Sequence, residues 1–305
     1  MKSLYILLLF ALTFSSCKDE LAVNPPDLSI ATEKNAYKVG EEVKFKIEGD
    51  AQLISFYSGE PLHDYTFREG RIVQPGKLRL SFQSSVEFGT QQGQFSVLVS
   101  TDFNGGSSFS DIQLANWTDI TSRFTLATTA VFTYSREIDI TDLAANAQTI
   151  FIAFRYKVKD QGVYGIGRTW RVENFLLNSE SSVGLQKKGD IPTSGFRLFD
   201  KQANIAPSRS TLSNSRISLV AHSVTDANRN LETENWAISK GFSIGTQDYG
   251  PDRPVPIKGI ADSKISTYKY VYTKEGIYKA VFIGYNANIS GSAELKKELT
   301  VTINP

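Results

Sequence analysis

Few residues of this 305-residue chain have the types and spacing that enzyme chemistry requires. Histidine is the most frequent general acid or base in enzymes, and only two occur here, His63 and His222. Neither belongs to a zinc pattern such as His-Glu-x-x-His. The glycines of residues 162–167 precede no helical pattern, so a phosphate-binding loop is not indicated. We therefore expect no catalytic site at these positions.

One group of carboxyl side chains, Glu137, Asp139 and Asp142, has a spacing that glycan hydrolysis could use. Alternate residues of a strand share one face, and retaining glycosidases place two carboxyl groups about 5 Å apart. The segment resembles the acidic strand of laminarinase-like glycoside hydrolases, but the third position on the face of Glu137 is Thr141. Such a hydrolase is the least favoured of three candidate functions, and we expect a protein that is not an enzyme.

One cysteine has surroundings that predict a covalent modification. Lys2 precedes an apolar run, residues 4–14, that is too short for a permanent membrane span, and two serines and Cys17 follow. This segment resembles a bacterial lipobox, which implies a lipoprotein signal peptide over residues 1–16 and acylation of Cys17. The next residues, Lys-Asp-Glu, resemble the signal that sends Bacteroidetes lipoproteins to the cell surface. We expect a lipid anchor in the outer membrane and a protein that faces the cell exterior.

The composition is that of an extracytoplasmic protein without disulfides. Met1 and Cys17 are the only residues of their types, so core burial alone must hold the folded part together. The 33 basic and 32 acidic residues nearly balance, which argues against binding nucleic acid. Residues 17–28 include two adjacent prolines, which exclude a helix, and we expect a tether there.

The elements that must position any site are expected to be strands. Apolar and polar residues alternate in several short runs, and this pattern buries one face of a strand while the other stays in water. Glycine-containing turn signals separate the runs at short spacing, which predicts an all-β fold. The clearest alternating runs are residues 43–47, 78–82, 95–99 and 278–282.

Two distant segments resemble the halves of one immunoglobulin-like domain. Residues 37–57 are similar to the first half of a PKD-type (polycystic-kidney-disease) domain, and residues 268–303 are similar to its second half. The resemblance implies a split Ig-like β-sandwich formed by residues 29–60 and 255–305. We expect a second domain, residues 61–254, inserted between them.

The expected insertion resembles a jelly-roll β-sandwich of the choice-of-anchor or cleaved-adhesin type, which is galactose-binding-like. The segments around Trp117, residues 152–156 and residues 169–175 follow in the order of that family. The strands that usually begin such a domain come late, at residues 195–198 and 236–239, so the jelly roll looks circularly rearranged. The whole chain resembles a family of Bacteroidetes surface lipoproteins, domain of unknown function 5017, which implies no particular reaction.

Binding of glycans is the function that these resemblances favour. Sandwich domains recognise sugars with exposed aromatic rings and nearby polar groups. Tryptophans within strand patterns belong in the core, which leaves turn residues as candidates. The candidate ligand-binding residues are Phe103, Asn104, Tyr164, Arg168 and Tyr249.

No cofactor is expected, although a structural Ca²⁺ is kept as an alternative. Asp102, Asn104 and Asp252 carry the oxygen ligands that calcium prefers, but no dense Asp-x-Asp run is present. The expected partners are a polysaccharide or oligosaccharide, the outer membrane through the lipid, and an outer-membrane glycan-import complex of a polysaccharide-utilisation system. The alternative function is an adhesin or a structural protein–protein interaction module.

Overall fold

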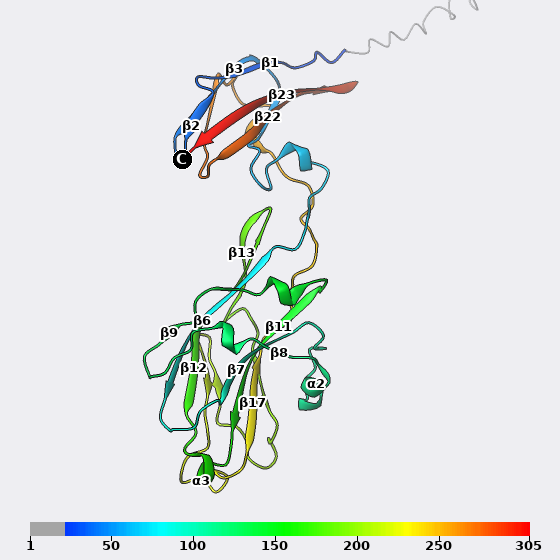
Figure 1. Cartoon of the computed structure of the whole chain (residues 1–305). Coiled ribbons are helices and arrows are strands. Elements are labelled where there is room, and N and C mark those ends of the chain that lie inside the picture. The colour runs from blue at the N-terminus through cyan, green and yellow to red at the C-terminus, as the bar shows by residue number, and fades with distance from the viewer. Residues whose placement is uncertain (1–21) are drawn as a thin grey trace, which may run out of the picture. The chain divides into compact units, whose positions relative to one another are not determined.

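The computed structural model describes residues 22–305, and 47% of the chain is strand against 7% helix (Figure 1). The all-β class is therefore confirmed, while Cys17 and the signal peptide lie outside the described residues. The chain divides into two compact units. Unit 1 runs through Arg71 and resumes from Gly250 to Pro305, and unit 2 is Ile72–Tyr249. The domain bounds given above stay a prediction. Within residues 22–305, no helix is long and apolar enough to cross a membrane.

Unit 1 contains a three-stranded and a five-stranded sheet. Every strand pair is antiparallel except β2–β23, which is parallel. The first sheet has the order β1 (Asp27–Thr32), β3 (Glu42–Asp50), β21 (Thr267–Val271). The second has the order β2 (Ala36–Lys38), β23 (Gly291–Asn304), β22 (Gly276–Asn288), β4 (Leu53–Tyr57), β20 (Val255–Lys258).

The core of unit 1 is aromatic and joins both sheets. Phe45 of β3 packs against Phe56 of β4 and Phe282 of β22, with ring centroids 5.4 and 5.1 Å away. All three rings are fully buried, and the alternation of residues 43–47 and 278–282 predicts this for Phe45 and Phe282. The hydroxyl of buried Tyr272 donates to the Ser58 carbonyl at 2.9 Å, so this polar group is satisfied inside the core.

Unit 2 contains a seven-stranded and a six-stranded sheet, in which every pair is antiparallel. The seven-stranded sheet has β10 (Ile138–Asp139), β6 (Lys77–Glu87), β12 (Thr169–Ser181), β16 (Arg216–Leu219) and β15 (Thr211–Leu212) in this order, with β13 (Gly184–Asp190) on β12 and β9 (Thr133–Tyr134) on β6. The six-stranded sheet has β14 (Arg197–Asp200), β17 (Thr233–Ile238), β11 (Thr149–Val158), β7 (Phe95–Ser100) and β8 (Thr118–Asp119), with β18 (Phe242–Ser243) on β11.

The segments that enter and leave unit 2 pair with each other. β5 (Ile72–Val73) forms a two-stranded antiparallel ladder with β19 (Gln247–Asp248). The register joins Ile72 to Asp248 and Val73 to Gln247. The two ends of this unit therefore lie side by side.

The six-stranded sheet of unit 2 carries a buried cluster on each of its faces. One face shares the main core with the seven-stranded sheet, where Phe82, Phe154 and Phe175 are fully buried. On the other face, a second cluster includes Phe151 and Trp236 together with Ile112 of the short helix α2 (Phe109–Leu114). The cover of α2 over this face is a feature that the strand patterns did not predict.

Trp170 and Trp236 are buried, as expected of tryptophans in strand patterns, and Trp117 is half-buried.

The remaining helical segments are short turns within loops. The short helical segments are η1 (Tyr65–Phe67) of unit 1 and η2 (Thr121–Arg123), η3 (Thr141–Ala144) and α3 (Gln161–Tyr164) of unit 2.

Candidate functional site

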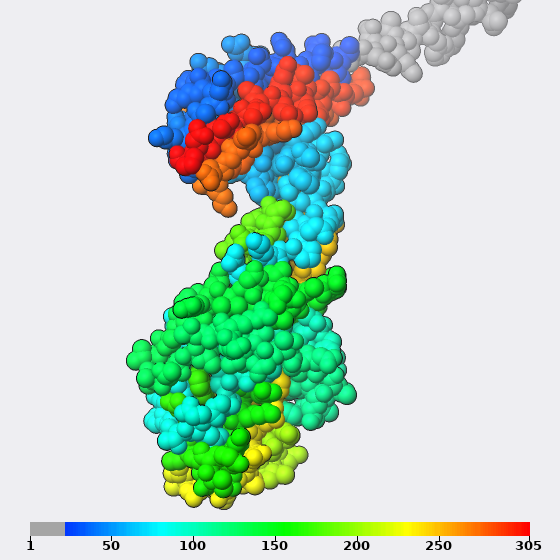
Figure 2. Space-filling view, in the orientation of Figure 1, coloured from blue at the N-terminus to red at the C-terminus, as the bar shows by residue number. Residues whose placement is uncertain are grey.

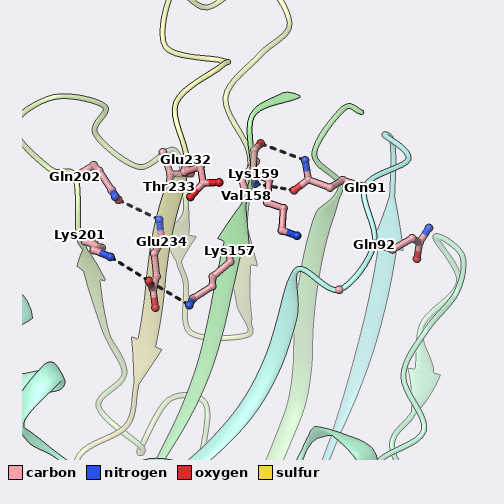
Figure 3. Close-up of a pocket in the computed structure, with 11 residues that line it drawn as sticks. Gln91, Gln92, Lys157, Val158, Lys159, Lys201, Gln202, Glu232, Thr233 and Glu234 are labelled. Carbon is pink, nitrogen blue, oxygen red and sulfur yellow. Dashed lines mark hydrogen bonds and ion pairs between the residues drawn. The ribbon is translucent and has the colours of Figure 1, made fainter. Parts of the chain in front are cut away.

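A pocket of about 280 Å³ lies where β11 ends and β17 begins, beside the residues that follow β14 (Figure 3). β11 and β17 are paired so that Lys157 stands opposite Glu234, and Val158 opposite Thr233. Val158 points into the core and is 3% exposed, so Lys157 and Lys159 project from the other face of β11 and its end. The pocket therefore opens on the outer face of the six-stranded sheet.

The floor of the pocket carries a shared ion pair. Oε2 of Glu234 lies 3.6 Å from Nζ of Lys157 and 3.7 Å from Nζ of Lys201. The Glu234 side chain is 14% exposed, whereas both lysines reach into solvent. The backbone N–H of Glu234 also donates to Oε1 of Gln202 at 3.1 Å. These contacts hold a carboxylate, an amide and two ammonium groups in fixed positions around one opening.

The side chain of Gln91 holds the backbone of Lys159 at the edge of the pocket. This side chain is 4% exposed, and its Oε1 accepts the backbone N–H of Lys159 at 2.8 Å. Its Nε2 donates to the carbonyls of Lys159 and Gly165, at 3.2 and 3.1 Å. A buried amide thus connects the end of β11 to the loop of residues 161–167 and fixes the position of the Lys159 backbone.

Tyr164 lies beside the pocket, although it does not line it. Its ring is 54% exposed, and its centroid is 4.8 Å from Nζ of Lys159. The short helix α3 begins with Asp160 as its N-cap, since the carboxylate accepts the N–H of Gly162 at 2.7 Å. Gln161 then donates to the carbonyls of His222 and Arg229, which joins this loop to residues 222–231 at one end of unit 2 (Figure 2).

Arg168 directly follows the same loop and binds the backbone of two other loops. Its Nε and one terminal nitrogen donate to the carbonyls of Phe88 and Thr128, both at 3.3 Å. The Arg168 carbonyl accepts from the hydroxyl of Tyr156. Burial raises the pKa of Tyr156 well above its ordinary value, so this hydroxyl stays protonated and remains a donor. Arg168 thus supports the loop and is not among the pocket residues.

Phe103 is buried, whereas Asn104 is exposed and belongs to the turn that follows it. The ring of Phe103 is 4% exposed and packs against Phe151 and Trp117, with centroids 5.1 and 5.5 Å away. Oδ1 of Asn104 accepts the N–H of Gly106 at 2.7 Å, and its Nδ2 donates to Asp111 at 3.1 Å. The expectation of a ring presented to a ligand at Phe103 is corrected, because that ring belongs to the cluster beneath α2.

Tyr249 is likewise engaged within unit 2. Its hydroxyl lies 2.6 Å from Oε1 of Gln186 and 3.1 Å from Oε1 of Gln247. The residue is half-buried and does not line the pocket. The contact with Gln186 attaches the last residue of unit 2 to strand β13, whereas Gln247 belongs to β19.

The oxygen atoms considered for Ca²⁺ are occupied by hydrogen-bond donors. Oδ1 of Asp102 accepts from Ser100 Oγ at 2.8 Å and from the N–H of Asn116 at 2.9 Å. Both carboxylate oxygens of Asp252 accept from Arg71, at 2.8 and 2.7 Å. Across residues 22–305, no group of three or more histidine, cysteine or acidic side chains has the arrangement of a metal site.

The acidic segment near β10 is committed to local contacts. Asp139 accepts from the hydroxyl and N–H of Thr141 at 2.6 and 2.9 Å, and these bonds lower its pKa. Asp142 accepts two bonds from Arg123, which likewise lower its pKa. Glu137 lies 3.5 Å from Arg79. A glycosidase acid needs a raised pKa, so the lowered pKa values of Asp139 and Asp142 do not suit either residue as the proton donor.

The remaining candidates for nucleophilic chemistry have no catalytic geometry. Ser243 stands in G-x-S-x-G spacing, but it ends the short strand β18 and no helix follows, unlike a nucleophile elbow. Nδ1 of His222 lies 3.0 Å from Oδ2 of Asp226, four residues further along the same loop. Nδ1 of His63 lies 2.7 Å from the Arg253 carbonyl. Each histidine therefore fastens a loop.

A family model described as Domain of unknown function (DUF5017) matches residues 16–194, more than half of the chain. The chain belongs to this family. The DUF5017 match ends within unit 2, so it includes Lys157 and Lys159 of the pocket but not Glu234, and it is shorter than the nearly full-length resemblance expected from the sequence. No curated protein and no solved structure matches the chain.

Proposed function

We propose that this protein binds an extracellular polysaccharide or oligosaccharide at the pocket beside Tyr164. The observation that carries the proposal is the pairing of a polar pocket with an exposed aromatic ring. Ammonium, amide and carboxylate groups exchange hydrogen bonds with sugar hydroxyls, and a tyrosine face packs on the apolar face of a sugar ring. Lys159 and Gln202 supply the first kind of group, and Tyr164 supplies the second.

The finer architecture belongs to the same proposal. Unit 1 is an Ig-like sandwich of the PKD type, split between residues 29–60 and 255–305, and residues 61–254 form a galactose-binding-like jelly roll. The two sheets of each unit, which share a buried core and are antiparallel except for the β2–β23 pair, support this assignment. A circular rearrangement of the jelly roll is supported by the pairing of β14 with β17 and of β17 with β11, since the late segments enter the central sheet.

The proposed location is the outer surface of the outer membrane. Lipid on Cys17 would anchor the chain, and residues 17–28 would separate the folded units from the headgroups. We propose an accessory role beside a glycan-import complex of a polysaccharide-utilisation system, in a protein that is not an enzyme. Replacement Glu137→Gln should accordingly leave any trace hydrolysis of a β-glucan unchanged.

The test of the binding function is a calorimetric or gel-shift screen of polysaccharides, followed by Tyr164→Ala. Loss of the aromatic face should weaken binding about tenfold, which corresponds to ~1.4 kcal/mol. Tyr134→Ala is the matched control, because Tyr134 is 53% exposed on β9 and does not line the pocket. Equal affinities in the two variants would refute the site, and the absence of binding to any glycan would refute the function.

Recognition of another protein is a second candidate function, favoured by one observation. Large apolar side chains are exposed on adjoining loops at the α3 end of unit 2, where patches of this kind often mark interfaces. Thr90 N–H donates to the Ile166 carbonyl at 2.8 Å, and Asn228 donates to the Ile205 carbonyl at 3.3 Å. The bond from Gln161 to the Arg229 carbonyl at 3.1 Å connects the two pairs of loops. The exposed fractions are Phe88 69%, Val163 72%, Ile166 45%, Ile205 69% and Leu231 41%.

The two functions give different results in one comparison. An adhesin or interaction module should co-purify with an outer-membrane protein and show no response to glycans. Replacement Val163→Ser should then abolish co-purification, since it removes apolar surface without touching the pocket. A glycan-binding protein should keep its full affinity for the polysaccharide in this variant.

A further inference from the structure

The three lysines of the pocket differ in how their charges are neutralised. Lys157 and Lys201 share the carboxylate of Glu234, at 3.6 and 3.7 Å. In the described part of the chain, Lys159 forms no ion pair with a carboxylate, and its Nζ lies over the Tyr164 ring. An ammonium group has three N–H donors, and a ring face satisfies only part of them. Lys159 is therefore the cation in this pocket with capacity for a charged ligand.

The position of Lys159 is fixed before any ligand arrives. Its backbone N–H and carbonyl both bond to the side chain of Gln91, which is 4% exposed. Its own side chain lies against Tyr164, which limits the directions that the ammonium can take. A cation that is already ordered loses less conformational entropy on binding.

The balance of charge in the pocket sets the kind of ligand. Three lysines and two glutamates line it, so one positive charge is in excess. Complementary charge across an interface gives specificity, and a single excess cation suits one negative group per sugar residue. Figure 3 shows that Lys159 and Glu234 lie on neighbouring strand ends, with the amide of Gln202 close to Glu234.

We infer that the pocket takes an acidic sugar residue whose single negative group, a carboxylate or a sulfate ester, pairs with Lys159. This inference rests on the proposed glycan-binding function and names the ligand class of the same site. The sugar ring packs on Tyr164, and its hydroxyls bond to Gln202 and Glu232. The ion pair at Lys159 then decides between acidic and neutral polysaccharides.

The test is a calorimetric comparison of acidic and neutral polysaccharides with the full chain. The carboxylate set is polygalacturonate, alginate and hyaluronan, the sulfate probe is κ-carrageenan, and the neutral set is methyl-esterified pectin, dextran and galactomannan. Methyl-esterified pectin is the matched ligand for polygalacturonate, because the backbone is the same and the charge is removed. We expect binding within the acidic set that weakens as salt is added, and the preferred probe separates carboxylate from sulfate.

Variants of the pocket identify the residue responsible. Lys159→Gln should weaken binding of the acidic polysaccharide about tenfold or more, as the loss of a charge-assisted hydrogen bond does. Lys159→Arg should restore the affinity. Lys240→Gln is the matched control and should change the affinity less than about twofold, because the Lys240 ammonium also lies over an aromatic ring, that of Phe242, but does not line the pocket.

Each other outcome overturns a distinct claim. Binding confined to neutral polysaccharides would overturn the acidic ligand class and leave the glycan-binding function intact. Acidic binding that is equal in Lys159→Gln and Lys240→Gln would overturn the assignment to Lys159. If none of these polysaccharides bound, the proposed function itself would fall.

Discussion

Asp252→Ala in unit 1 gives the sharpest test of how this fold is held together. Arg71 donates to both carboxylate oxygens of Asp252, and the two side chains are 6% and 0% exposed. The N–H of Asp64 adds a third bond at 2.9 Å, and the guanidinium stacks on Phe67 at 3.7 Å. Removing the carboxylate leaves a buried guanidinium without its partner, which costs about 3–5 kcal/mol.

A second ion pair in unit 2 has the same geometry without the burial. Arg123 donates to both oxygens of Asp142, at 2.8 and 2.7 Å, but their side chains are 34% and 57% exposed. Water solvates either partner when the other is lost, so Asp142→Ala should cost less than about 1 kcal/mol. The two ion pairs therefore differ in their exposure to solvent rather than in the lengths of their hydrogen bonds.

The unfolding of the two units in urea can be monitored separately. The three tryptophans of the chain, Trp117, Trp170 and Trp236, all lie in unit 2, so tryptophan fluorescence reports that unit and circular dichroism reports both. Asp252→Ala should lower the free energy of unfolding of unit 1. The change should be seen in the circular dichroism transition but not in the tryptophan fluorescence transition. Equal losses in the Asp252 and Asp142 variants would refute the claim that burial decides the strength of these pairs.

The same pair predicts a dependence on pH. Burial by itself would raise the pKa of Asp252 and is the largest single influence on it. The hydrogen bonds from Arg71, the hydrogen bond from the Asp64 N–H and the positive charge of Arg71 together outweigh burial and hold that pKa below the ordinary value. A depressed carboxyl pKa contributes stability that is present above the ordinary pKa and disappears as the pH falls through the depressed one. Wild-type unit 1 should therefore lose this contribution only in strongly acidic solution, and Asp252→Ala should lack that part of the acid dependence.

Three further predictions use single contacts. Tyr272→Phe leaves a buried carbonyl without its donor and should cost about 1–3 kcal/mol in urea unfolding; an unchanged midpoint would contradict it. Gly59→Ala should lower the melting temperature more than Gly40→Ala, because both have φ near +80° but a Cβ at Gly59 would stand 2.7 Å from backbone atoms, whereas Gly40 has open space. The Lys187 ammonium and a threonine hydroxyl lower the pKa of Asp190 to about 2, so Lys187→Met should raise that pKa in an NMR titration, and no shift would exclude the contact in solution.

The strands were predictable because their signal is local. Period-two alternation in residues 43–47 and 278–282 corresponds to β3 and β22, with the apolar positions in the core. Helix α2 was missed since six residues carry little periodicity, although Ser108 and Asp111 form a capping box that can be found in the sequence. The turn signal after Phe103 was real, but it did not reveal that a helix would cover the ring.

The pocket was missed for a different reason. Alternation along residues 157–159 predicts that the two lysines share a face, but Glu234 reaches Lys157 only through the long-range register of β11 with β17. A local pattern cannot specify which distant strand becomes the neighbour. Tyr164 was chosen as a turn aromatic, and the structure places it beside this pocket through Lys159. Charged residues that alternate at the end of an apolar strand are the signal that could have located the site.

The ladder of β5 with β19 has an evolutionary and practical consequence. Because Ile72, the first residue of unit 2, pairs with Asp248 next to its last residue, the segment 72–249 is a cassette whose ends meet. Such a cassette can be excised, exchanged or joined end to end by a short peptide, as permutation and insertion experiments require. A segment with a different ligand specificity can therefore replace residues 72–249 without any redesign of unit 1.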